Sequence, residues 1–199
     1  MKINQILFDT EKFVKINKDP TNSLKNSANK IISTLNAAQD CTKISKIIGD
    51  YQPGYTYGNV KTHKQNSPLR PIISQVLTPT YNLAKTINNI ITPYTPNNYM
   101  LNSTNEFIDL LNISSCRGLI ASLDVESLFT NVPVDDTINI IIKNVYNHPN
   151  IPPPKIPPNI LKELLNLYTK ELPFISPSGH IYKQNRRVSY GLTIGTLFC

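Results

Sequence analysis

The sequence has no long uninterrupted run of apolar residues, and this absence excludes several classes of protein. No apolar stretch approaches the roughly 18 residues of a membrane-spanning helix. Residues 1–20 mix Lys, Asp and Glu into every short apolar run, so no signal-peptide core can be drawn. These absences favour a protein of the nucleus or the cytoplasm, without a membrane partner.

Cysteines are also few. Cys41, Cys116 and Cys199 are widely spaced and include no CxxC pair. This spacing argues against a zinc site and against a disulfide framework, and it fits a reducing compartment. The chain has no internal repeat. Its 199 residues are enough for one core of ordinary size.

Charged residues make up 17% of the chain, and their placement is uneven. The formal net charge is +7, and residues 1–70 hold eleven Lys and Arg against five Asp and Glu. A basic region beside a nearly neutral remainder suits an anionic partner, with nucleic acid as the first candidate, because neutralised phosphates release counterions. An ordinary solvated surface is the alternative, and charge alone favours that alternative.

Hydrophobic periodicity predicts helices in residues 1–50. Leu24, Ala28 and Leu35 recur at helical spacing, and Ile44 and Ile48 continue the pattern after a break. The run YQPGYTY at 51–57 is rich in turn formers. It leads to two extended segments, 58–63 and 69–75, which the turn KQNSP joins into a hairpin.

The remainder alternates between helical and extended patterns. Pro79 begins one helical pattern, and Ser103 with Glu106 forms a capping box that begins another. Residues 119–125 are short and densely apolar, which is typical of a buried strand. The remaining predicted elements are a helix over 133–147, a proline-rich loop at 151–159, a helix carrying Leu161 to Tyr168, and a hairpin over 174–182.

These patterns predict an α/β (α+β) fold. Its centre is a small, mainly antiparallel sheet that contains the strand at 119–125. Helices 79–92 and 133–147 pack against this sheet, and the hairpin over 57–75 projects from it.

Asp124 is the residue that points most directly to chemistry. It stands at the end of the apolar strand pattern, where a lone buried carboxylate is costly unless it is paired or bound to a metal. Two-metal nucleotidyl transfer needs such carboxylates, because they hold two Mg²⁺ ions about 3.5–4 Å apart. The alternative is an Asp that caps the following turn, and Asp124 taken by itself favours this alternative.

Three stretches in order resemble the reverse transcriptases of Penelope-like retroelements. ASLDVESLFTNVP at 121–133 resembles the family's A motif, YGNVKTHKQNSPLRPIIS at 57–74 resembles its fingers motif, and PTYNLAK at 79–85 also has a counterpart. The resemblance covers roughly residues 50–199. It implies a partial reverse transcriptase domain over 51–199, made of fingers and incomplete palm, after a helical N-terminal segment over 1–50.

The resemblance implies RNA-directed DNA polymerase activity. It also implies a primer-template and dNTP as partners, and Mg²⁺ in a two-metal site. Asp124 would be the first metal-binding carboxylate, with the Val125 carbonyl beside it. Phe129 would lie beneath the incoming sugar, where a ring favours deoxynucleotides; a core Phe is the alternative.

The resemblance also assigns cations on the fingers hairpin. Lys61, Lys64 and Arg70 would meet the triphosphate and the nucleic acid, and the planar fork of Arg suits bidentate contact with phosphate oxygens. Each taken singly is also compatible with an ordinary surface cation. Gln184 matches the Gln of the family's next motif and would contact the nucleotide. Asp135 and Asp136 are interpreted as a helix cap and not as a catalytic pair.

The sequence departs from the family after Gln184. Arg187 stands where the family has Gly, and Tyr190 stands where it has Met. A tight turn that needs positive φ would be strained by Arg. The family's paired-Asp motif, thumb and endonuclease do not follow, so we expect an incomplete metal site in this chain. The alternative function is a non-catalytic nucleic-acid-binding protein.

Overall fold

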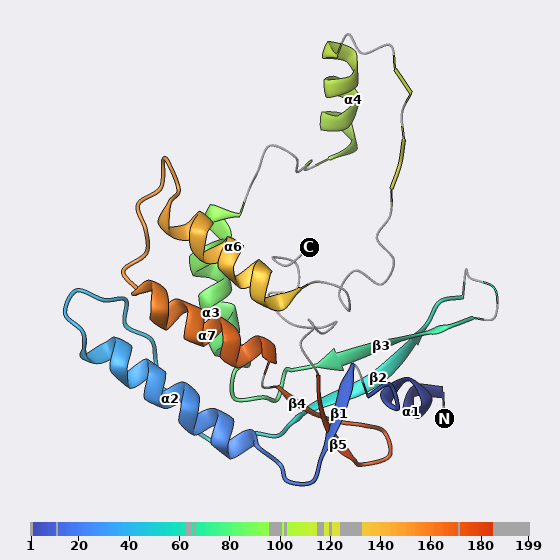
Figure 1. Cartoon of the computed structure of the whole chain (residues 1–199), viewed down its shortest axis with the longest axis vertical. Helices are drawn as coiled ribbons and strands as arrows, with labels where there is room; N and C mark the ends of the chain where they lie inside the picture. The colour runs from blue at the N-terminus through green and yellow to red at the C-terminus, as the bar shows by residue number, and fades with distance from the viewer. Residues whose placement is uncertain are drawn as a thin grey trace.

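Apart from the short N-terminal helix, which lies beside the sheet, the helices and the strands occupy separate regions of the molecule, as Figure 1 shows. The computed structural model describes residues 2–10, 12–62, 65, 67–95, 101, 103–114, 118–119, 121–123, 133–170 and 172–184. The elements in chain order are α1 (Lys2–Leu7), β1 (Phe13–Ile16), α2 (Thr21–Ala37), β2 (Gly54–Val60), β3 (Leu69–Ser74), α3 (Tyr81–Ile91), the 3₁₀ helix η1 (Thr92–Tyr94), α4 (Thr104–Ile113), α6 (Val134–Tyr146), α7 (Pro158–Lys170), β4 (Pro173–Ile175) and β5 (Ile181–Gln184).

The five strands form one sheet in the order β1-β5-β4-β2-β3. The pairings of β1 with β5, β5 with β4 and β2 with β3 are antiparallel, and only β2 with β4 is parallel. The mixed α/β class is therefore confirmed, with a sheet that is small and mainly antiparallel. The two predicted hairpins, β2–β3 and β4–β5, are both present.

The larger hydrophobic core lies among α2, α3, α6 and α7. The faces that periodicity predicts are buried, including Leu24, Ala28 and Leu35 of α2 and Ile138 of α6. This core contains no strand residue. The expectation that the helices over 79–92 and 133–147 pack against the sheet is therefore wrong for their buried faces, because each apolar stripe is already covered by neighbouring helices.

A smaller core lies between α1 and the sheet. Its buried residues are Ile3, Leu7, Phe13, Ile73, Phe174 and Tyr182. The Phe13 and Phe174 rings meet edge-to-face at 5.8 Å, and the Phe174 and Tyr182 rings stack at 6.0 Å. Residues near both ends of the described chain thus build one core.

The helical prediction for residues 1–50 holds for α1 and α2 and is wrong elsewhere. Phe13–Ile16 is a strand, because β5 offers it an antiparallel edge. Residues 38–53 form no helix. Ile44 is nevertheless buried in the larger core, so its apolar periodicity reported burial in an extended segment.

Two asparagines of α2 hold this extended segment in place. The Asn36 side chain accepts a hydrogen bond from the Ile44 N–H at 3.0 Å and donates to the Ile44 carbonyl at 2.8 Å. The Asn29 side chain binds Ile47 in the same two-way manner, at 2.8 and 2.9 Å. Each amide thus replaces a neighbouring strand and satisfies backbone groups that would otherwise be buried unpaired.

We expect Asn29→Ala and Asn36→Ala each to lower the free energy of unfolding by about 1–3 kcal/mol, because each change leaves an N–H and a carbonyl of the extended segment without its partner. Urea unfolding followed by circular dichroism measures the loss. Asn26→Ala is the matched control, since Asn26 lies exposed on the same helix. Equal stability of all three variants would contradict a stabilising role for the Asn29 and Asn36 side-chain amides.

The proline-rich loop at 151–157 is anchored by two tyrosines. The Tyr94 hydroxyl donates to the Pro152 carbonyl at 2.8 Å, and the Tyr146 hydroxyl donates to the Ile156 carbonyl. Burial, together with nearby Tyr94, raises the pKa of Tyr146 to about 12. This phenol therefore stays protonated and keeps its donor through the physiological range. The predicted loop is confirmed, and tertiary contacts order it.

Ser103, the first residue of the predicted capping box, caps the start of α4. The Ser103 side chain accepts a hydrogen bond from the Glu106 N–H at 3.2 Å. No residue of α4 is buried, and its apolar side chains, Phe107 among them, are exposed. Figure 1 shows α4 standing apart from the other helices. The cap thus defines where this helix begins without any support from packing.

The predicted buried strand over 119–125 is wrong in its described part. Residues 119 and 121–123 have no regular structure, and Leu119 and Leu123 are almost fully exposed. A strand needs a neighbour for its backbone groups, and none of the five paired strands adjoins these residues. The apolar character of these residues was therefore not enough to predict a strand.

Candidate nucleic-acid interface

The β2–β3 hairpin carries the described cations that the resemblance implies in the fingers. Its ladder runs from Tyr55 opposite Ser74 to Val60 opposite Leu69. The Lys61 N–H donates to the Pro68 carbonyl at 2.9 Å and extends the ladder by one pair. Figure 1 shows the hairpin extending away from the helices, with α1 beside it. The prediction of a projecting hairpin is confirmed; β2 begins at Gly54, inside the run predicted to be turns.

The two faces of the hairpin differ in their neighbours. Directly opposite residues of paired strands share a face, and successive residues alternate between faces. Gly54, Thr56 and Gly58 share the inner face with Ile73, which α1 covers; Thr56 and Ile73 are buried. The outer face therefore carries Tyr55, Tyr57, Asn59, Arg70, Ile72 and Ser74.

The structure brings two predicted cations to one end of this hairpin. Arg70 lies on β3 opposite Asn59, and Lys61 follows β2 two residues beyond Asn59. Alternation along the extended ladder directs both side chains to the outer face. Both residues are partly buried, so their stems rest on the hairpin.

Most of the other predicted site residues cannot be related to this pair. Lys64, Asp124, Val125 and Phe129 lie outside the described residues. Gln184 ends β5, where its backbone pairs with Phe13 at the opposite edge of the sheet from the hairpin. Lys61 and Arg70 on the hairpin are thus the predicted site residues that the structure places relative to each other.

Two tyrosines on the outer face were missed by sequence reasoning. The rings of Tyr55 and Tyr57 stack with centroids 6.0 Å apart and planes 29° apart. They remain 47% and 45% exposed. The run that contains them was interpreted as turns. Their spacing of two residues was the available signal, because it places both rings on one face once the segment is a strand.

The outer face continues across the rest of the sheet. The register places Ile175 beside Tyr55, Ile181 beside Ile175, and Ile16 beside Ile181. Lys183 lies opposite Val14 on the same face. This surface is half-exposed and apolar, with cations toward both of its sides.

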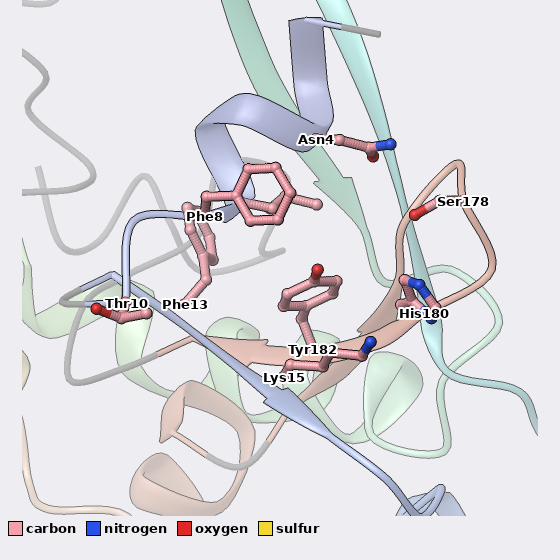
Figure 2. A pocket seen from close by; sticks show the side chains of 9 residues that line it. Asn4, Phe8, Thr10, Phe13, Lys15, Ser178, His180 and Tyr182 are labelled. Atoms are coloured by element: carbon pink, nitrogen blue, oxygen red, sulfur yellow. The ribbon is translucent and has the colours of Figure 1, made fainter.

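The inner face carries a cavity that is separate from the hairpin cations. It has a volume of about 310 Å³ and is lined by Asn4, Leu7, Phe8, Thr10, Phe13, Lys15, Ser178, His180 and Tyr182. Figure 2 shows Tyr182 between Phe8 and Phe13 on one side and His180 and Ser178 on the other. No residue that the sequence suggested for the polymerase site lines this cavity.

The described residues contain no group of three or more His, Cys, Asp and Glu side chains arranged to hold a metal ion. The proposed ligands Asp124 and Val125 lie outside those residues. None of the described helices combines the length and the apolar character needed to cross a bilayer.

Comparisons with known proteins found no counterpart for this chain. No protein-family model matches the sequence, no curated protein matches it, and no solved structure matches it. The function is therefore inferred from the residues, from the resemblance of their sequence motifs and from their geometry.

We expect Gly54→Ala to destabilise the junction of β2, β3 and β4. An added Cβ would lie 2.6 Å from the Ser74 carbonyl oxygen, which is backbone and cannot move aside cheaply. Overpacking of this kind costs about 1–3 kcal/mol, which thermal unfolding would detect. Gly118→Ala is the control, because its Cβ would meet nothing within 4 Å. An unchanged melting temperature for Gly54→Ala would contradict this close approach.

Proposed function

We propose that this chain forms the fingers and the first part of the palm of a reverse transcriptase, with the β2–β3 hairpin as its contact to nucleic-acid phosphates. One observation carries the proposal. The stretch at 57–74, which resembles the fingers motif of Penelope-like elements, forms a projecting antiparallel hairpin with Lys61 and Arg70 near its free end.

The electrostatics of the hairpin support phosphate binding. A guanidinium offers a planar set of donors that matches phosphate oxygens, and an ammonium adds a point charge. Lys61 and Arg70 together give this end of the hairpin a positive potential, which attracts polyanions. Primer-template and dNTP are the anionic ligands that the proposal assigns to this surface.

Polymerase activity is the part of the proposal that depends on the resemblance. Asp124 and Val125 are its proposed metal-binding groups, and Phe129 and Gln184 are its proposed nucleotide contacts. Mg²⁺ held at such a site would supply the charge stabilisation for nucleotidyl transfer.

A second candidate function is nucleic-acid binding without turnover. One observation favours it. Leu119 and Leu123, which the polymerase interpretation places in a buried palm strand, are exposed and outside any strand. Catalytic carboxylates must be held rigidly in position, and Leu123 immediately precedes Asp124 in the sequence. Both functions use the same hairpin.

Binding to a primer-template duplex should be strongly salt-dependent. We expect the logarithm of affinity to fall with the logarithm of salt concentration, by about 0.9 units for each phosphate contact on duplex DNA. The triple variant Lys61→Gln, Lys64→Gln, Arg70→Gln should flatten this slope by about 0.9 for each contact removed. Fluorescence anisotropy across a salt series measures both slopes.

The matched control removes three positive charges elsewhere. Lys30, Lys46 and Lys143 are exposed on the helical side of the molecule, and their replacement by Gln changes the net charge by the same amount. We expect a smaller change of slope for this control. Equal slopes in the two triple variants would mean that the hairpin makes no special contact.

Primer extension separates the two candidate functions. We expect no incorporation by this chain alone, because one carboxylate cannot hold two metal ions. Joined to the downstream palm and thumb of a related element, a polymerase should incorporate dNTP in the presence of Mg²⁺, and Asp124→Asn should abolish that incorporation, because the change keeps the side-chain shape and removes its charge. Asp109→Asn, an exposed carboxylate on α4, is the control and should have no effect. Binding without incorporation in the joined protein would favour the non-catalytic function.

A further inference from the structure

The stacked tyrosines on the outer face are held in place before any ligand arrives. Tyr57 lies opposite Ile72, and Tyr55 lies beside Ile175 in the parallel ladder. Both isoleucines are partly buried, so they form an apolar floor next to the rings. Rings that are already ordered lose little conformational entropy when a ligand stacks on them.

Positive charge adjoins these rings on the outer face of the described strands. Lys61 and Arg70 lie toward the free end of the hairpin, and Lys183 lies toward the other side of the sheet. None of the outer-face residues of the five described strands is Asp or Glu. A ligand that covers this face should therefore carry flat apolar rings and negative charge together.

We propose that the outer face of the sheet binds an unpaired strand of nucleic acid, with bases stacked on Tyr55 and Tyr57 and phosphates directed toward Lys61 and Arg70. The inference rests on the proposed function, in which the hairpin binds nucleic acid. It adds that the bound nucleic acid is an unpaired strand. A duplex hides its base faces within the stack, so only an unpaired strand can offer them. Stacking should also tolerate any sequence, since every base has a flat face.

Self-association of this face is the main competing explanation. A second copy of the same face would bring cations, and no carboxylate from its outer-face strand residues, toward Lys61. Like charges brought together in this way oppose association. A polyanion meets no such opposition.

The first test uses the whole chain and a labelled uridine oligomer of about 12 nucleotides, with a thymidine oligomer as a second arm. Tyr55→Leu and Tyr57→Leu should each weaken binding roughly tenfold, because a stacking surface is removed while the charge is unchanged. Tyr55→Phe and Tyr57→Phe should keep the affinity. Phe107→Leu, which removes an exposed ring from α4, is the matched control and should bind normally.

An abasic sugar-phosphate oligomer of the same length isolates stacking from charge. It offers the phosphates without the bases, so the two Leu variants should bind it as tightly as the unchanged protein does. The variant Lys61→Gln, Arg70→Gln should instead weaken binding to both oligomers.

A spectroscopic test does not depend on the Leu variants folding. The sequence has no tryptophan, so Tyr57→Trp introduces a single selectively excitable ring. Uridine and thymidine oligomers should quench its fluorescence through stacking, and the abasic oligomer should not. Phe107→Trp is the control and should show no quenching with either kind of oligomer.

Three results would overturn the inference. Normal affinity of the Leu variants, with weakened binding of the Lys61 and Arg70 variant, would remove the stacking role and leave the proposed function intact. An equal loss for the abasic oligomer would show that the tyrosines only shape the hairpin. A dimer in sedimentation that the Leu variants dissociate would assign the face to a second copy. Loss of the proposed function would appear differently, as no binding of the unchanged protein to any oligomer.

Discussion

The register of strand β2 in this sheet is constrained by its inner face, which has little room for a side chain at Gly54 and Gly58. A Cβ at Gly54 would meet the Ser74 carbonyl oxygen at 2.6 Å, and a Cβ at Gly58 would lie 2.9 Å from the Ile3 side chain. A slip of one residue would turn Tyr55 and Tyr57 into this crowded space. The small inner residues thus force the aromatic residues outward, and the position of Arg70 follows from the same register.

The elements that support the hairpin come from both ends of the described chain. Helix α1 covers the inner face, β4 pairs with β2, and β5 carries β1 on its far edge. These pairings are distant in sequence, so their loop-closure entropy must be offset by the contacts they create. Once formed, they hold the hairpin from one side and leave Tyr55 and Tyr57 about half exposed on its other side, where a ligand can reach them.

Elements with strong local signals were predicted well, and elements that depend on distant partners were not. The helices α2, α3, α6 and α7 followed from apolar spacing, and the start of α4 followed from its capping box. The strand at Phe13–Ile16 was missed because its partner lies more than 160 residues away. Ile44 was expected in a helix, since periodicity cannot show that the Asn36 side-chain amide binds its backbone in a segment without regular structure.

The sequence by itself determined which residue types stand on the hairpin: two cations that suit phosphate, and tyrosines spaced two residues apart. Only the tertiary structure decided what that spacing means. Alternation assigns residues to two faces, but it does not say which face will be covered. Packing of α1 against the side that carries the glycines decided this, because a helix approaches most closely where side chains are absent. The tyrosines and Arg70 lie on the outer face as a physical consequence.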